Sequence, residues 1–139
     1  GEYSPHVRVI RKLWQDGTPV VPVELIGEMP CFGVLSFAAQ NCPRDGPFDR
    51  ELLREKLRRV LNVAQEHGHD GLVLGAFGSG YFANPAVEVA ECFAELLLGD
   101  DSEFGQSFKQ CIFAVPRKFG RHNFEAFESR FPGIDSHCG

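Results

Sequence analysis

Short apolar runs alternate with longer amphipathic segments along this chain of 139 residues. A short apolar run between turn residues is typical of a strand that is buried on both faces of a parallel sheet. Such runs predict buried strands at 32–39, 71–74 and 111–115. A further strand is predicted at 7–14, and Pro22 confines the apolar segment 20–25 to a sheet edge or a loop.

Helices are predicted where apolar residues recur at helical spacing. The clearest helix covers 48–67, with one apolar stripe and one charged face. The residues expected on its buried stripe are Leu52, Leu53, Leu57, Val60, Leu61 and Ala64. Asp45 or Asp49 is the predicted cap at its start, and Gly68 is the predicted stop. Three further helices are expected at 85–98, 103–109 and 123–130.

The order of these elements predicts the fold class. Strands that alternate with helices favour an α/β fold with right-handed crossovers and a mostly parallel sheet. Helices would then cover both faces, which gives a three-layer α/β/α arrangement. The length and the absence of an internal repeat or linker predict a single module over 1–139.

A glycine-rich segment, 75–85, carries the strongest functional signal. It reads Gly-Ala-Phe-Gly-Ser-Gly-Tyr-Phe-Ala-Asn-Pro and lies between a predicted strand and a predicted helix. Glycines allow a tight turn and the close approach of a ligand to the main chain. Asn84 is a good N-cap and Pro85 suits the first helical turn, so the following N–H groups would face the loop. This pattern predicts an anion site, most naturally for phosphate, although a tight turn that binds nothing has the same pattern.

The net charge of −5 argues against non-specific nucleic-acid binding, which needs lysine and arginine to displace counterions. It does not argue against a small phosphate ligand, because backbone N–H groups and a helix dipole hold phosphate without a local lysine. The longest apolar run is too short to cross a bilayer, and no signal-peptide pattern opens the chain. We therefore expect an intracellular protein, cytoplasmic or nuclear, without a membrane span.

Three other candidate sites are weaker. The five cysteines include no CxxC pair, so reduced thiols are expected rather than a zinc site or a disulfide framework. The run His67-Gly68-His69-Asp70 is better explained as a helix stop than as a metal site. Ser79 does not match a nucleophile elbow, because Phe77 and Tyr81 stand where that motif has glycine.

The glycine segment and its surroundings resemble the microbial type of poly(ADP-ribose) glycohydrolase, a family with a macrodomain-like fold. The most specific part is Leu72 to Pro85, followed by Val87, Val89, Ala90 and Phe93. The other matching segments, in chain order, are Tyr3-Ser4-Pro5 with the strand at Val7, Ser36 to Asn41, Arg59-Val60-Leu61 with Ala64 and His67 to Asp70, and Ile112 to Val115 with Phe127. The resemblance covers nearly the whole chain.

This resemblance implies how ADP-ribose would bind. The backbone of Gly78, Ser79, Gly80 and Tyr81 would hold the diphosphate, and Tyr81 or Phe82 would pack against the distal ribose. Asn84 would cap the helix or reach a hydroxyl. The expected ligand-binding residues are therefore Gly75, Ala76, Phe77, Gly78, Ser79, Gly80, Tyr81, Phe82, Asn84 and Asn41.

Some of these positions have a second interpretation. Asn41 either bonds the ligand or serves as a turn residue before Pro43. Arg117 and Asn123 are further, weaker candidates; they lie in the loop after the last predicted strand, where this fold often contacts the nucleotide. Among the phenylalanines, Phe77, Phe82 and Phe119 lie on loops where an aromatic ring could stack on adenine, although core packing is the favoured interpretation for any single one of them.

The catalytic signature of the family, three glycines followed by Gln-Glu-Glu, is absent from this sequence. Gln65-Glu66-His67 lies inside the predicted helix and does not replace it. Glycosidic cleavage needs a carboxyl group placed at the scissile bond, and the sequence ties none to the glycine segment. We therefore expect binding of ADP-ribose or ADP-ribosylated targets without catalysis, and no catalytic residue, cofactor or metal.

Two alternatives stay open. The chain could be the C-terminal part of a poly(ADP-ribose) glycohydrolase that hydrolyses when the N-terminal catalytic segment is present, or a structural domain whose loop binds nothing. Whether the ligand is monomeric or polymeric, and whether the protein is an oligomer, are likewise open.

Overall fold

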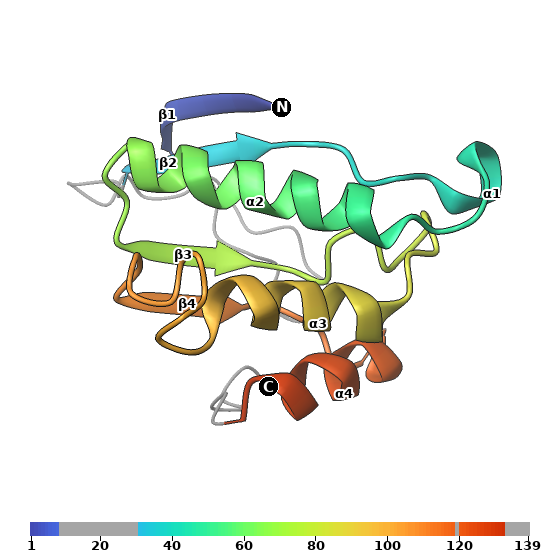
Figure 1. Ribbon diagram of the computed structural model, residues 1–139. Coiled ribbons are helices and arrows are strands. Elements are labelled where there is room, and N and C mark those ends of the chain that lie inside the picture. The colour runs from blue at the N-terminus through green and yellow to red at the C-terminus, as the bar shows by residue number, and fades with distance from the viewer. Residues whose placement is uncertain (9–30, 119, 133–139) are drawn as a thin grey trace, which may run out of the picture. The chain divides into compact units, whose positions relative to one another are not determined.

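The computed structural model describes residues 1–8, 31–118 and 120–132. Figure 1 shows the elements in chain order, namely β1 (Glu2–Arg8), β2 (Cys31–Ser36), α1 (Cys42–Asp45), α2 (Arg50–Glu66), β3 (Gly71–Leu74), α3 (Ala86–Leu97), β4 (Gln110–Phe113) and α4 (Arg121–Arg130). The chain forms two compact units, Gly1–Phe37 and Ala38–Gly139. The fold is mixed α/β; the predicted strand segments 9–14 and 20–25 lie outside the described residues.

The first unit contains an antiparallel pair of strands. β1 pairs with β2 from Glu2 opposite Ser36 to Arg8 opposite Cys31, with an irregularity between Ser4 and Val7. The prediction of a buried strand at 32–39 is wrong in two respects. The strand, β2, ends at Ser36, and it is not buried, since Phe32 is 47% exposed. The apolar run is a strand, but a two-stranded ribbon does not bury its own faces.

The second unit contains a short parallel sheet. β3 and β4 pair from Gly71 opposite Gln110 to Leu74 opposite Phe113. Leu74 is half-buried and Phe113 is buried, whereas Val73 and Ile112 are exposed. Burial on both faces is therefore wrong for these strands as well. Side chains alternate between the two faces of a strand, and the described residues bury only one of these faces.

The amphipathic pattern located α2 correctly. Leu53, Leu57, Leu61 and Ala64 are buried, while Leu52 from the predicted stripe is exposed. The side chain of Asp49 accepts a hydrogen bond from the N–H of Leu52 at 2.9 Å, which confirms Asp49 as the N-cap. The helix ends before Gly68, whose φ of 73° is left-handed, as expected for a glycine stop.

Two segments differ from the expected helices. Residues 103–109 form turns, with the N–H of Gly105 bonded to the carbonyl of Ser102 at 3.3 Å and that of Ser107 bonded to Phe104 at 3.1 Å. Each of these bonds spans three residues, so no α-helical ladder forms. The segment 42–45 forms a further short helix, α1, since Pro43 is compatible with the first positions of a helix.

The helices of the second unit bury a cluster of aromatic rings. The ring of Phe93 on α3 lies 5.2 Å from that of Phe113 on β4, and Phe113 lies 5.1 Å from Phe127 on α4. The Phe113 and Phe131 rings are 4.4 Å apart. Figure 1 shows α3 and α4, which carry Phe93 and Phe127, side by side. These phenylalanines therefore form part of the core of the second unit.

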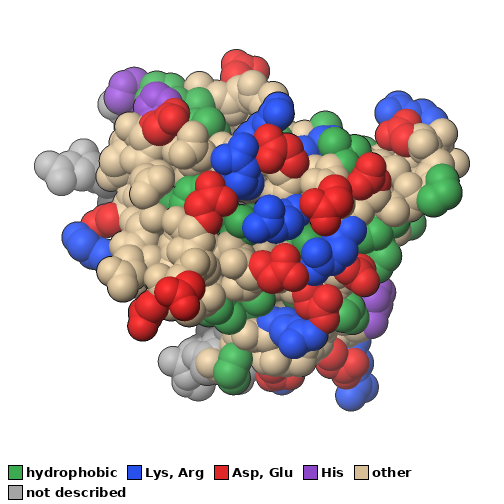
Figure 2. All heavy atoms as spheres, viewed as in Figure 1, with side chains coloured by type: hydrophobic (Ala, Val, Ile, Leu, Met, Phe, Trp, Pro, Cys, Tyr) green, Lys and Arg blue, Asp and Glu red, His purple; other side chains and the backbone are tan. Residues whose placement is uncertain are grey.

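Ion pairs join α2 and α3 across their exposed faces. Arg50 contacts Glu88 at 2.8 Å and Glu95 at 2.6 Å. Figure 2 shows acidic and basic side chains intermixed over these helices. The face therefore carries paired charge of both signs. Among the described residues, no helix combines the length and the apolar character that a membrane span requires.

Candidate functional site

The glycine loop, Gly75–Pro85, begins at the carboxyl end of β3. Because β3 and β4 are parallel, the segment after β4 starts from the same edge of the sheet. A hydrogen bond of 2.7 Å from the N–H of Ala114 to the carbonyl of Leu74 joins the two segments where they leave β3 and β4. Loops at the carboxyl ends of strands are where α/β folds bind ligands, so the loop has the position that the sequence predicted.

Local turns hold the glycine loop in shape. The N–H of Phe77 bonds to the carbonyl of Gly75 at 2.8 Å, and that of Ser79 bonds to Ala76 at 3.1 Å. The N–H of Ala83 bonds to Gly80 at 3.0 Å. These bonds occupy the Ser79 amide, which the family resemblance had assigned to the diphosphate.

Four other amides of the loop remain available. The N–H groups of Gly78, Gly80, Tyr81 and Phe82 have no hydrogen-bond acceptor among the residues that the structure describes. Consecutive backbone N–H groups without acceptors are suited to bind an anion. The loop therefore offers donors at three of the four positions predicted for phosphate, and at Phe82 in addition.

Gly78 and Gly80 have different surroundings. Gly78 has φ +73°, and a Cβ there would lie 2.6 Å from the Cβ of Ala39 and from Nδ2 of Asn84. A Cβ on Gly80 would meet no atom within 4 Å. Gly78 thus permits the close packing that shapes the loop, whereas Gly80 borders open space next to the unpaired amides.

Asn84 does not cap α3, and that prediction is wrong. The N-cap is Pro85, and no side chain caps the helix. Asn84 is 3% exposed, and its Nδ2 donates to the carbonyls of Gln40 at 2.8 Å and Gly78 at 3.0 Å. Bonding to these part-buried carbonyls takes the side chain away from the helix start. Asn84 instead ties the glycine loop to the segment after β2.

Asn41 and Asn123 reach the same region from other parts of the chain. The N–H of Cys42, next to Asn41, donates to the carbonyl of Phe82 at 3.1 Å, and Nδ2 of Asn123 on α4 donates to the carbonyl of Ser79 at 3.4 Å. Gln40, which was not among the predicted ligand-binding residues, contributes the carbonyl that binds Asn84. The position of Asn123 after the last strand was the only sequence signal for its role.

Unsatisfied polar atoms concentrate around the loop. The buried oxygens without a hydrogen-bond partner among the described residues are Oδ1 of Asn41, Oγ of Ser79, Oδ1 of Asn84 and Oδ1 of Asn123. Such atoms are uncommon in folded proteins because each costs free energy. These atoms cluster where the glycine loop, α1 and α4 meet. Their clustering makes this polar region a candidate functional site.

Two aromatic side chains lie beside the available amides. Tyr81 is 89% exposed, and its ring centroid is 6.2 Å from that of the half-buried Phe82. Phe77 is half-buried, and Phe119 lies outside the described residues. An exposed ring next to an anion site provides an apolar surface for a sugar or a base.

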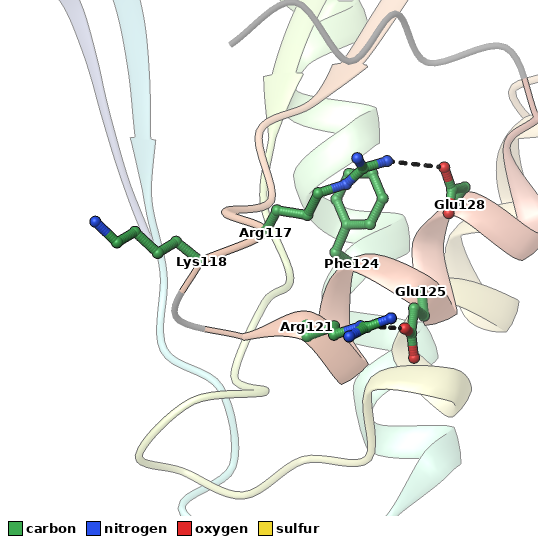
Figure 3. Close-up of a pocket in the computed structure, with 6 residues that line it drawn as sticks. All are labelled: Arg117, Lys118, Arg121, Phe124, Glu125 and Glu128. Carbon is green, nitrogen blue, oxygen red and sulfur yellow. Dashed lines mark hydrogen bonds and ion pairs between the residues drawn. The ribbon is translucent and has the colours of Figure 1, made fainter. Parts of the chain in front are cut away.

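A pocket of about 590 Å³ lies on the segment after β4 and on α4 (Figure 3). Its lining consists of Arg117, Lys118, Arg121, Phe124, Glu125 and Glu128. The Arg117 guanidinium lies 4.4 Å from the ring centroid of Phe124 and 3.4 Å from Glu128, and Arg121 bonds to Glu125 at 2.8 Å. Charges of both signs are therefore paired inside the pocket, which sets it apart from the unpaired donors of the glycine loop.

The carboxylates with a shifted pKa bond to partners outside the glycine loop. The Arg44 guanidinium and the Asn41 amide hold the pKa of Asp45 below its ordinary value. Hydrogen bonds from Arg58 and Arg59 lower the pKa of Glu55 to about 2. Among the described residues, no Asp or Glu hydrogen-bonds to the glycine loop, and no group of His, Cys, Asp and Glu is arranged to hold a metal.

Comparison with known proteins found no matching family model and no matching curated protein. Among solved structures, the poly(ADP-ribose) glycohydrolase (PARG) from Thermomonospora curvata is 36% identical, with a TM-score of 0.78 over 93% of this chain and 46% of that chain. The same enzyme bound to the inhibitor ADP-HPD matches with 36% identity and a TM-score of 0.77 over 93% of this chain and 48% of that chain. PARG from Deinococcus radiodurans in complex with ADP-ribose is 32% identical, with a TM-score of 0.73 over 92% of this chain and 50% of that chain. The chain thus spans about half the length of the structures it matches.

Proposed function

Because this chain belongs to a family of proteins like poly(ADP-ribose) glycohydrolase, we propose that it binds ADP-ribose, free or attached to a protein, through the glycine loop. The observation that carries the proposal is the group of unpaired amides at Gly78, Gly80, Tyr81 and Phe82. They border the open space at Gly80, so a ligand can approach the main chain closely. The D. radiodurans structure holds ADP-ribose, which supports the choice of ligand.

The diphosphate is the part of the ligand that these amides suit. Charge-assisted hydrogen bonds from backbone N–H groups to an anion are stronger than those between neutral groups. The positive end of the α3 dipole, at Ala86, adds to the attraction. Since the Ser79 amide is occupied by Ala76, the proposed contacts are made by Gly78, Gly80, Tyr81 and Phe82.

Sugar recognition would fall to the aromatic side chains and polar atoms around the loop. Tyr81 or Phe82 packs against the distal ribose in this proposal, as the exposure of Tyr81 allows. Asn41 stays a candidate for contact with a ligand hydroxyl. It directly precedes α1, and the N–H of the first residue of α1, Cys42, bonds to the carbonyl of Phe82 in the glycine loop. We further propose the macrodomain-like three-layer arrangement, with a mostly parallel sheet and a single module over 1–139, for the complete fold around this site.

Isothermal titration of the 139-residue chain with ADP-ribose tests the proposal. We expect saturable binding and a rise in melting temperature with ligand concentration, because a ligand that binds only the folded state stabilises it. AMP, which lacks the diphosphate, should bind at least tenfold more weakly. If ADP-ribose gives neither a heat of binding nor a shift in melting temperature, a structural domain whose loop binds nothing is the better interpretation.

The second candidate function is part of a glycohydrolase. It is favoured by one observation, that the chain matches about half of each PARG structure. On this interpretation the loop binds the same ligand, and residues of the unmatched half supply the carboxylate that cleavage needs. Mass spectrometry of the intact polypeptide in its native cell distinguishes the two candidates, since a longer polypeptide favours the enzyme.

A further inference from the structure

Ala83, in the glycine loop, has a backbone conformation that alanine rarely adopts. Its φ is 54°, which lies in the left-handed region. Among the residues that the structure describes, every other one with a positive φ is a glycine. The side chain of Ala83 is exposed, so packing of its methyl group does not hold this conformation. A non-glycine residue stays left-handed only where its surroundings fix the backbone, and such residues cluster at functional sites.

Hydrogen bonds on both sides of Ala83 fix its backbone. The carbonyl of the preceding residue, Phe82, accepts bonds from the N–H of Cys42 at 3.1 Å and from Nδ2 of Asn84 at 3.4 Å. The N–H of the following residue, Asn84, bonds to the carbonyl of Gly78 at 3.0 Å. Both peptide groups that adjoin Ala83 are therefore tied to other parts of the chain, and rotation of either group would break these bonds.

Ala83 also closes the turn that carries two of the unpaired amides. Its N–H bonds to the carbonyl of Gly80 at 3.0 Å. A bond that spans three residues encloses the two residues between its ends, here Tyr81 and Phe82, in a β-turn. The N–H groups of these two residues have no acceptor in the described part of the chain. The conformation of Ala83 therefore helps to set the direction in which both amides point.

We propose that Ala83 is a positioning residue, whose left-handed conformation holds the amides of Tyr81 and Phe82 ready for the diphosphate. This inference rests on the proposed binding of ADP-ribose. A loop that already has its binding conformation does not have to be ordered when the ligand arrives, and this raises the affinity. A side chain that disfavours the left-handed region lowers the fraction of protein in the binding conformation, and the apparent affinity falls by the same factor.

Three substitutions at position 83 test the proposal in the 139-residue chain. Ala83→Val disfavours the left-handed region because valine is β-branched, whereas Ala83→Asn is the matched control, with a side chain of similar size that tolerates this region. Ala83→Gly keeps the conformation accessible without a side chain. At a temperature where all variants are folded, titration calorimetry should show ADP-ribose binding at least about fivefold weaker for Ala83→Val, and within about twofold of the original chain for the other two.

NMR of the ligand-free proteins supplies a second readout, which does not depend on binding. Ala83→Val should move the amide signals of Tyr81 and Phe82 further than Ala83→Asn does. If the original chain binds ADP-ribose and the valine and asparagine variants bind it equally well, the positioning role is overturned and the proposed function stands. A lower melting temperature of Ala83→Val with unchanged affinity overturns it too, because the role of Ala83 is then structural only. If the original chain does not bind, the proposed function itself fails, and the inference that rests on it fails with it.

Discussion

Gly78 and Gly80 are two residues apart, but they serve the site in different ways. A side chain at Gly78 would collide with Ala39 and Asn84 in a left-handed backbone conformation. A side chain at Gly80 would enter open space beside the free amides. Substitution at the first position should therefore affect folding, and substitution at the second should affect ligand binding.

The Gly80 variants separate binding from stability. Gly80→Glu should weaken ADP-ribose binding at least 100-fold, equal to about 2.7 kcal/mol, because the carboxylate fills the space and repels phosphate. Gly80→Ala is the matched control and should bind within a few-fold of the original chain. Titration calorimetry measures both, and circular dichroism should show unchanged folding. If the two variants bind ADP-ribose with equal affinity, the phosphate does not bind at this loop.

Asn84 supports a prediction about stability as well as binding. Asn84→Ala removes the side-chain donor that Gln40 and Gly78 share. The Gly78 carbonyl keeps its bond from the backbone N–H of residue 84, whereas the Gln40 carbonyl loses its donor, and a buried carbonyl left unsatisfied costs about 1–3 kcal/mol. We expect a clear fall in melting temperature and weaker ADP-ribose binding, since the loop loses its tie to the segment after β2. Asn62→Ala, on the exposed face of α2, is the control and should have little effect. A melting temperature equal to that of the control would contradict the anchoring role.

At the scale of the element, α2 shows how charge contributes to stability. Glu55 accepts hydrogen bonds from Arg58 at 2.9 Å and from Arg59 at 2.7 Å. These bonds lower the pKa of Glu55 from 4.5 to about 2. Because the side chain is exposed, the pair contributes modestly in spite of the large shift.

The direction of the pH effect follows from that shift. A carboxyl whose pKa is lower in the folded state stabilises the fold above its unfolded pKa, and this contribution is lost as the pH falls from 4.5 toward 2. Chemical denaturation between pH 6 and about 2.5 should show falling stability, and Glu55→Gln should make the curve shallower in this range. If the curves of the variant and the original chain coincide over the whole range, the ion pair has no measurable effect.

At the scale of the whole molecule, the described residues offer groups that suit ligand binding but no carboxylate placed for cleavage at the same loop. The proposed binding groups lie on the glycine loop, but no described carboxylate hydrogen-bonds to it. We predict that the purified 139-residue chain releases no ADP-ribose from poly(ADP-ribose), as measured by chromatography of the products. The T. curvata enzyme is the positive control. Release by the chain alone would show that its own residues supply the catalytic carboxylate.

Local patterns predicted several elements well and others poorly. The stripe of Leu53, Leu57 and Leu61 located α2, because helical spacing is a property of neighbouring residues. The apolar runs located β2, β3 and β4 but not their burial, since burial depends on what covers each face. At 103–109 the sequence pattern predicted a helix where the chain forms turns.

By itself, the sequence determined the order of strand, glycine loop and helix, the resemblance to the PARG family and the position of the candidate loop. Glycine placement and apolar spacing are local and can be read along the chain. Only the tertiary structure decided that Asn84 binds Gln40 rather than capping α3, and that Asn123 reaches Ser79. It also decided which amides stay free. These facts depend on contacts between residues far apart in sequence, which no local pattern encodes.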